Sequence, residues 1–327
     1  MDSRFNSQDR SILSDSDNVK HIRAFAPATV ANMGCGFDIM GMTLDGVGDI
    51  VSVYVKDGDG MSIRNESDAE LPEDMEKNVI TPALRAMIKA YGSPIQVDVV
   101  IEKKIAPGSG IGSSAASSAA AVFALNEALG RPFFPEELVE FAMEGEKLIS
   151  GGTPHADNAA PAILGGVVLM RGYEPLDIVR LPVLEQFCCS VVHPAIMVST
   201  KMAREVLPKE IPLRLAVKQW GNVGGLVAGL ALGDVNLIGR AMCDVVVEPH
   251  RKRFIPGFDA LREKVLAEGA LAMNISGAGP SVFALSSDME TAAAVGEVMR
   301  RHFEEMDIAC DVYVENISNI GARVIHG

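Results

Sequence analysis

The sequence predicts an α+β protein with two domains. Its 327 residues exceed the usual size of a single core, and 48% of them are hydrophobic, which is enough to bury two cores. Segments with the period of strands alternate with segments with the period of helices, and this pattern restarts after Arg171. We therefore expect a disordered polar tail at residues 1–19, a first domain at 20–175 and a second domain at 176–327.

The sequence of the first domain predicts strands near its start and mainly helices after them. Residues 21–55 alternate apolar residues with glycines, which predicts strands joined by tight turns, most clearly at Val51, Val53 and Val55. Apolar residues at helical spacing predict a helix over 77–91, which Gly92 ends. The further elements that we expect are strand 97–102, helices 113–129 and 135–148, a break at 151–154, a loop at 155–161 and strand 166–170.

The second half continues the same alternation. The expected elements are strand 190–193, helices 201–207, 212–232 and 257–268, strands 270–275 and 282–285, helix 291–306 and strand 309–314. Such a series predicts helices packed on a sheet, with the boundary between the domains near residues 171–185.

One glycine-rich segment carries the strongest chemical signal, Pro107-Gly-Ser-Gly-Ile-Gly-Ser-Ser-Ala-Ala-Ser-Ser118. Gly108, Gly110 and Gly112 carry no Cβ, so the backbone can turn sharply and bring its N–H groups close to a phosphate. The helix that follows adds unpaired N–H groups and the positive end of its dipole. No lysine follows the last glycine and the spacing is not G-x-G-x-x-G, which excludes the Walker A and Rossmann patterns.

Charge and cysteine content limit the partners and the compartment. The chain has 29 basic and 43 acidic residues, and its formal charge of −14 disfavours nucleic acid and anionic membranes as partners. A bound nucleotide would need local compensation by N–H groups, a few basic side chains and Mg²⁺. The five cysteines show no C-x-x-C pair, which favours a reducing cytoplasm over a disulfide framework or a zinc site. No run of 18 apolar residues predicts a membrane span, and the first 20 residues lack the apolar core of a secretory signal.

Three stretches together resemble the GHMP small-molecule kinases. They are Ala26-Pro-Ala-Thr-Val-Ala-Asn-Met-Gly-Cys-Gly-Phe-Asp38, the glycine-rich segment, and Asn274-Ile-Ser-Gly-Ala-Gly-Pro-Ser281. Within this superfamily the chain resembles the homoserine kinase family, through residues 31–38, His155-Ala-Asp-Asn-Ala-Ala-Pro-Ala162, and Glu248-Pro-His-Arg251 followed by Ile255-Pro-Gly-Phe258. The resemblance covers residues 20–325.

The resemblance implies both a fold and a reaction. The fold is an N-terminal domain like domain 2 of ribosomal protein S5, with a left-handed β-α-β unit, and a ferredoxin-like C-terminal domain. The reaction is transfer of phosphate from ATP to the side-chain hydroxyl of L-homoserine, a step of threonine biosynthesis. Small molecules are then the expected partners, and a homodimer remains open.

The resemblance also implies the residues of a nucleotide and metal site. Those expected at ATP are Pro107, Gly108, Ser109, Gly110, Ile111, Gly112, Ser113, Ser114, Ala115 and Asn78. Ser114 and Glu146 match the Mg²⁺ ligands of the family, a pair of hard oxygens. The alternatives are an N-cap for Ser114, a helix N-terminal turn for Asn78, and a solvated helix face for Glu146, with Glu144 as the substitute ligand.

An amino-acid substrate needs a cation for its carboxylate and acceptors for its ammonium group. Arg204 and Arg251 match the carboxylate-binding arginines of the family. The residues matched around the polar head are Asn32, Asp38 and His155, and Thr200 would share a helix face with Arg204. Taken alone, the two arginines could be surface residues and His155 an ordinary loop histidine.

Phosphoryl transfer needs alignment and charge compensation more than covalent help. The resemblance implies that Asn158 orients the substrate hydroxyl, whereas Asp157 is either a base or a structural carboxylate bonded to its own turn. The loop that supports the glycine-rich segment in the family corresponds to Ser276, Gly277 and Gly279, although a plain turn between strands would have the same composition.

Two other functions are compatible with the same motifs. A GHMP kinase for another small alcohol would leave Arg204 and Arg251 unexplained. A non-catalytic regulator with this fold would be expected to have lost a phosphate-loop or metal residue, yet Ser114, Glu146 and the three glycines are present. The sequence therefore favours an enzyme.

Overall fold

The computed structural model describes residues 19–69, 71–72, 74–150 and 155–326. Of the tail expected at residues 1–19, only Val19 lies within these ranges, and the break expected at 151–154 lies outside them.

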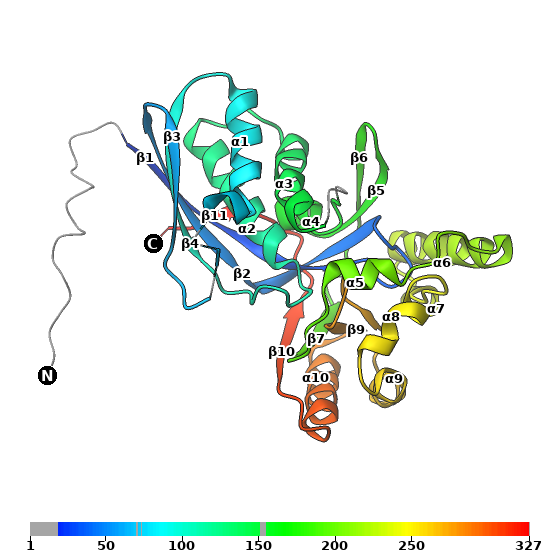
Figure 1. Cartoon of the computed structure of the whole chain (residues 1–327). Helices are drawn as coiled ribbons and strands as arrows, with labels where there is room; N and C mark the ends of the chain where they lie inside the picture. Colours follow the sequence, from blue (N-terminus) through cyan, green and yellow to red (C-terminus); the bar gives the residue numbers. More distant parts are fainter. Residues whose placement is uncertain (1–18, 70, 73, 151–154, 327) are drawn as a thin grey trace, which may run out of the picture.

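Residues 20–181, together with a short strand near the end of the sequence, build a seven-stranded sheet (Figure 1). Its strands are β1 (Lys20–Ala31), β2 (Met40–Asp57), β3 (Gly60–Asn65), β4 (Ile95–Glu102), β5 (Val167–Tyr173), β6 (Leu176–Leu181) and β11 (Arg323–Val324). The order is β11-β1-β2-β4-β3, and β5 pairs with both β2 and β6. Among the strand pairs of the described residues, only β3 and β4 run parallel, with helix α1 in the connection between them.

Helices cover one face of this sheet. They are η1 (Met75–Lys77), α1 (Ile80–Tyr91), α2 (Ser113–Ala128), α3 (Pro135–Ser150) and α4 (Ala159–Leu164). Helix α2 consists mostly of small residues, and its side chains are buried almost all round. It therefore lies against β1 and β2 on one side and against α1, α3 and α4 on the others, which fixes its N-terminus at the centre of the domain.

The second half builds a four-stranded antiparallel sheet. Its strands are β7 (Cys188–Pro194), β8 (Ala272–Ile275), β9 (Val282–Ser286) and β10 (Cys310–Asn316), in the order β10-β7-β9-β8. This is the ferredoxin-like order that the resemblance implies. Helices α9 (Phe258–Ala267) and α10 (Met289–Glu304) pack on one face of it, around Leu261, Met299 and Phe303.

The connection between β7 and β8 carries the remaining helices, and a shared core joins the two sheets. The helices are α5 (Thr200–Glu205), α6 (Leu213–Leu232), α7 (Val235–Ala241), α8 (Glu248–Arg251) and η2 (Lys252–Phe254). Buried residues of the first sheet, such as Met42, form one apolar cluster with Phe283 of β9, Leu230 of α6 and Ile238 of α7. The loops at the junction are therefore held against each other by packing.

The predicted α+β class and the predicted helices and strands are confirmed, with bounds that differ by a few residues. Seven elements were not predicted, namely β3, β6, β11, α4, α7, α8 and η2. Helix α8 and strand β11 are too short to show a clear apolar period, and β3 is too exposed to show one. Strands β6 and β11 lie beyond residue 175 and yet belong to the first sheet, through pairing with β5 and β1; the division into domains at 175 and 176 stays a prediction. Within the described ranges, no helix combines the length and the apolar character needed to cross a membrane.

Candidate active site

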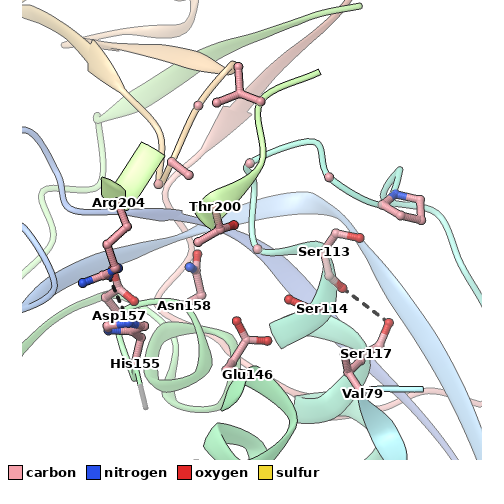
Figure 2. Close-up of a pocket in the computed structure, with 18 of the residues that line it drawn as sticks. Val79, Ser113, Ser114, Ser117, Glu146, His155, Asp157, Asn158, Thr200 and Arg204 are labelled. Atoms are coloured by element: carbon pink, nitrogen blue, oxygen red, sulfur yellow. Dashed lines mark hydrogen bonds between the residues drawn. The ribbon is translucent and has the colours of Figure 1, made fainter. Parts of the chain in front are cut away.

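A single cavity of about 360 Å³ brings most of the predicted site residues together, from both halves of the chain. Figure 2 shows Asn158 and Glu146 between two groups of side chains, with His155 and Arg204 on one side and Ser113 and Ser114 on the other. Of the predicted residues, Ser109, Ile111, Ala115 and Ser276 do not line the cavity; all four are fully buried behind it.

The glycine-rich loop has the backbone that its glycines allow. Gly108, Gly110 and Gly112 have φ angles of +78°, +76° and +71°, a region that other residues adopt only with strain. A Cβ on Gly110 would lie 3.2 Å from the carbonyl oxygen of Gly279, so the second glycine also permits close packing of two loops. Helix α2 begins directly afterwards at Ser113, and its N-terminal N–H groups face this end of the cavity.

The loop at residues 276–281, between β8 and β9, donates hydrogen bonds to the glycine-rich loop. The Ser276 hydroxyl donates to the carbonyl oxygen of Gly110 at 2.7 Å, and the Ser281 hydroxyl donates to that of Ser109. On the other side, the Asn32 amide donates to the carbonyl oxygen of Gly277 at 2.9 Å. The supporting role expected for this loop is thus visible as hydrogen bonds across the two halves of the chain.

Lys103 was not predicted, although it lines the cavity. Its Nζ pairs with the Asp49 carboxylate and donates to the carbonyl oxygen of Ser113 at 2.5 Å and to the Ser117 hydroxyl at 3.0 Å. The second Asp49 oxygen accepts from the backbone N–H groups of Lys104 and Ile105. This buried network ties the first turn of α2 to β2. The sequence signal for it was a lysine at the end of an apolar strand.

Glu146 on α3 is buried at the cavity and lacks a counter-charge in contact. Its Oε1 has no hydrogen-bond partner, and burial raises the pKa of Glu146 to about 7, an effect that Ser114 and Lys103 only partly offset. Glu144 instead pairs with Lys147 and does not line the cavity. An orphaned buried carboxylate next to a serine hydroxyl is a pair of hard oxygen ligands that fits Mg²⁺, which Glu146 and Ser114 would hold. The described residues contain no cluster of three or more His, Cys, Asp or Glu side chains able to hold a metal by themselves.

At the other side of the cavity, Arg204 of α5 pairs with Asp38. Nη1 and Nη2 of Arg204 each lie 3.1 Å from a carboxylate oxygen. Nη2 also lies 3.0 Å from Nε2 of His155, which must accept because a guanidinium only donates. His155 is therefore neutral, with its proton on Nδ1 facing Asp38 at 3.6 Å. Burial, together with the two arginines, lowers the pKa of His155.

Arg251 of α8 lies close to the same group. Its Nε donates to the carbonyl oxygen of Ala203 at 3.0 Å and its Nη1 to that of Gly277 at 2.9 Å. The guanidinium carbons of Arg204 and Arg251 lie 5.4 and 5.0 Å from the centre of the Phe37 ring, so one aromatic ring contacts both cations. Burial lowers the pKa of Arg251 to about 10, which still leaves the group charged at neutral pH.

The remaining predicted residues also face the cavity. Thr200 is the first residue of α5, so it shares a helix with Arg204 as expected. Asn78 accepts the N–H of Ile80 with its Oδ1 at 3.0 Å and thereby starts α1, as the alternative reading of this residue required, yet it also lines the cavity beside Leu71 and Ile101. Asn158 precedes α4, and its Oδ1 accepts the hydroxyl of Thr29 at 2.7 Å.

Asp157 is nearly inaccessible and carries no strong counter-charge. Burial raises the pKa of Asp157 to about 8, and the neighbouring carboxylates of Asp38 and Glu146 raise it further, against a smaller opposite effect of Arg204. In the ligand-free protein this carboxyl therefore keeps its proton to a much higher pH than an exposed aspartate.

Comparison with known proteins gives the same family for both halves of the chain. Residues 78–166 match the GHMP kinases N terminal domain, and residues 226–305 match the GHMP kinases C terminal domain. The chain is 44% identical to the homoserine kinase of Chlorobium phaeobacteroides over 94% of its length and 100% of that protein. The crystal structure of homoserine kinase from Cytophaga hutchinsonii superposes with a TM-score of 0.89 at 46% identity, over 96% of this chain and 100% of that one. Mevalonate kinase from L. major, at 17% identity, a TM-score of 0.64 and coverage of 90% and 95%, shares the fold. The chain belongs to the homoserine kinase family of GHMP kinases.

Proposed function

We propose that this protein transfers the γ-phosphoryl group of ATP to the side-chain hydroxyl of L-homoserine, giving ADP and O-phospho-L-homoserine for threonine biosynthesis. The observation that carries the proposal is one cavity lined both by an anion-binding loop and by the Arg204–Asp38 ion pair. The homoserine kinases that resemble this chain over nearly their whole length support the same reaction.

The nucleotide would lie along the glycine-rich loop. The N–H groups of Gly108 to Ser114 and the start of α2 would bind its phosphates, while Leu71 and Ile101 would enclose the base. Because Oδ1 of Asn78 already accepts from Ile80, the amide NH₂ of Asn78 is the group left to donate to the base. When bound, Mg²⁺ would be held by Ser114 and Glu146 and would neutralise charge on the phosphate oxygens.

The amino acid would bind by exchanging partners with an existing ion pair. Its carboxylate would take the guanidinium groups of Arg204 and Arg251, and its ammonium group would take the carboxylate of Asp38. The backbone N–H of Asp38 already donates to Oδ1 of Asn32, which fixes the loop that carries this carboxylate. A ligand with both charges leaves neither protein group unpaired.

The hydroxyl would then be aligned by Asn158, with no obligatory base. In a loose transition state the bond to the attacking oxygen has hardly formed, so little positive charge develops on the hydroxyl, and its proton can leave late, to a phosphoryl oxygen. Because burial raises the pKa of Asp157, its carboxyl would keep a proton near neutral pH and would contact the substrate hydroxyl as a polar neighbour rather than as the base. Alignment and charge compensation then supply most of the rate.

The direct experiment couples ADP release to NADH oxidation with ATP, Mg²⁺ and L-homoserine, and identifies the phosphorylated product by ³¹P NMR. We expect turnover with homoserine and none with mevalonate. Turnover of another small alcohol in place of homoserine would establish the broader GHMP kinase reading. Binding of ATP with no transfer to any alcohol would establish a regulator.

We also propose a cytoplasmic location, and whether the protein forms a homodimer stays open. All five cysteines are free, as is usual in a reducing compartment. Cell fractionation tests the location, and light scattering coupled to gel filtration tests the oligomeric state.

A further inference from the structure

Thr29 lies at the point where the glycine-rich loop meets the residue expected to align the hydroxyl. It is on β1 and fully buried. Its backbone N–H donates to the carbonyl oxygen of Ile111 at 3.1 Å, and its hydroxyl donates to Oδ1 of Asn158 at 2.7 Å. A Cβ on Gly112 would lie 2.0 Å from that hydroxyl, so the glycine leaves room for it. One side chain therefore contacts both parts of the transfer site.

The hydrogen bond from Thr29 decides which atom of the Asn158 amide faces the cavity. An amide is planar and carries its oxygen and its nitrogen on the same carbon, so an oxygen held by Thr29 turns the nitrogen away from Thr29. Nδ2 makes no hydrogen bond to the described residues, and Asn158 lines the cavity. The group that faces the ligands is thus an NH₂ donor, suited to a phosphoryl oxygen or to a lone pair of the attacking hydroxyl.

We propose that Thr29 is a positioning residue for phosphoryl transfer, which acts by fixing the orientation of the Asn158 amide. The inference rests on the proposed function. The last torsion of an asparagine side chain is broad, so without Thr29 the amide can turn and present its oxygen to the phosphate. An oxygen there repels the phosphoryl group, whereas the NH₂ attracts it. Loss of the hydroxyl should therefore lower kcat while ATP and homoserine still bind.

The chain offers a closely matched control. Thr43 of β2 is the register partner of Thr29 in the same sheet and is equally buried, but its hydroxyl donates to the backbone carbonyl of Pro161 at 2.7 Å. Thr29→Val and Thr43→Val each replace a buried threonine hydroxyl by a methyl group of similar size. We expect similar losses of thermal stability in both variants. Only Thr29→Val should lower kcat, by about 10- to 100-fold, with each KM changed less than about threefold.

Rescue and coupling separate positioning from general damage. Thr29→Ser keeps the hydroxyl and should retain kcat within about threefold of the unmodified enzyme. In an Asn158→Ala background, Thr29→Val should cost little more, because the group on which Thr29 acts is gone. Should Thr29→Val not fold, Thr29→Ala removes the same hydroxyl without adding bulk and takes its place in the comparison. The proposal is overturned if the two losses add independently, if Thr29→Ser is as slow as Thr29→Val, or if Thr43→Val loses as much kcat.

The two proposals fail in different ways. If the unmodified enzyme phosphorylates another alcohol, the assignment of homoserine fails, and the same variants are measured with that alcohol. A neutron diffraction structure of Thr29→Val with an ATP analogue distinguishes the oxygen of the amide from its NH₂ and gives a readout that does not depend on turnover. An Asn158 amide that keeps its orientation in that structure contradicts the role of Thr29, whichever substrate is used.

Discussion

Arg204 and Asp38 form a bidentate ion pair in the very place where an amino acid is expected to bind. Their side chains are 33% and 26% exposed, so water screens the pair only in part. A ligand with a carboxylate and an ammonium group can replace both halves of the pair. A ligand with only one of these groups leaves an unpaired charge behind. Under the proposed function, selectivity for amino acids would come from this exchange of partners.

This exchange predicts how Asp38→Asn changes substrate preference. The variant removes the partner of the ammonium group, so kcat/KM for homoserine should fall by about 10-fold or more. The activity with 4-hydroxybutyrate, which has no ammonium group, should fall much less or rise. Steady-state kinetics with both substrates checks the ratio. An equal loss for the two substrates would show that Asp38 does not contact the ammonium group.

Glu146→Gln should separate ligand binding from turnover. The amide keeps the shape of the side chain but loses the negative charge proposed to hold Mg²⁺, so ADP formation should fall by at least about 100-fold while the protein stays folded. Glu144→Gln is the matched control on the same helix, since Glu144 pairs with Lys147 and lies outside the cavity lining, and its kcat should stay within about twofold. Titration with Mg²⁺ in the coupled assay, with circular dichroism, gives the measurement. Equal activities of the two variants would contradict the assignment.

Gly112→Ala and Gly108→Ala compare two glycines with the same backbone strain. Both have φ near +70° to +80°, so each alanine should cost about 1–2 kcal/mol of unfolding free energy. At Gly108 a Cβ would meet open space, whereas at Gly112 it would clash with the Thr29 hydroxyl and approach Oδ1 of Asn158 to 3.0 Å. Denaturant unfolding should therefore show a clearly larger loss for Gly112→Ala. Equal losses would mean that the loop relaxes freely around the added methyl group.

Lys103→Met should strongly destabilise the protein. It leaves the Asp49 carboxylate buried with no cation beside it, which typically costs about 3–5 kcal/mol. Lys56→Met, which breaks the partly exposed pair of Lys56 with Asp98 on the same sheet, should cost less than about 1 kcal/mol. Urea unfolding of both variants tests the difference. A small effect at Lys103 would indicate that Ser117 and the backbone N–H groups satisfy Asp49 by themselves.

The raised pKa of Asp157 predicts how the stability of the protein depends on pH. Its pKa is 3.8 in the unfolded reference and about 8 in the folded protein, so between these values the folded state holds a proton that the unfolded chain has lost. The contribution of this group is therefore most favourable below about pH 4, and it is lost as the pH rises toward 8. Asp157→Asn cannot ionise and should raise the melting temperature of the ligand-free protein at pH 8 by about 2–5 °C, with a smaller gain at pH 5. Melting curves at both pH values decide the point, and a gain independent of pH would contradict it.

The sequence predicted the elements that have a clear period or a strong local signal. Helix α2 and the loop before it follow from glycines and small residues alone, and the three positive φ angles are what that composition allows. The pairing of β6 with β5 could not be predicted, because the register of an exposed strand is set by its neighbour rather than by its own sequence.

The residues of the site also fall into those that the sequence predicted and those that it did not. Residues within named motifs, such as Asn158 and Arg251, were predicted from the resemblance, and the cavity brings them together. Lys103 and Thr29 were not predicted, because their roles depend on partners that are distant in sequence, Asp49 in one case and Asn158 in the other. Periodicity places Thr29 within a buried strand and Lys103 directly after one, and it shows neither partner. Their polar contacts appear once the strands are paired.

Strand β11 joins the sheet at the outer edge of β1, where Ala24 pairs with Val324. During translation β1 is synthesised early and β11 much later, so this edge of β1 has no partner strand while the segments between them are made. An open strand edge can pair with another chain, and a nascent first domain would carry this hazard until β11 has been made. Pairing with β11 thus removes one site of intermolecular strand pairing, at Ala24 and Phe25 of β1.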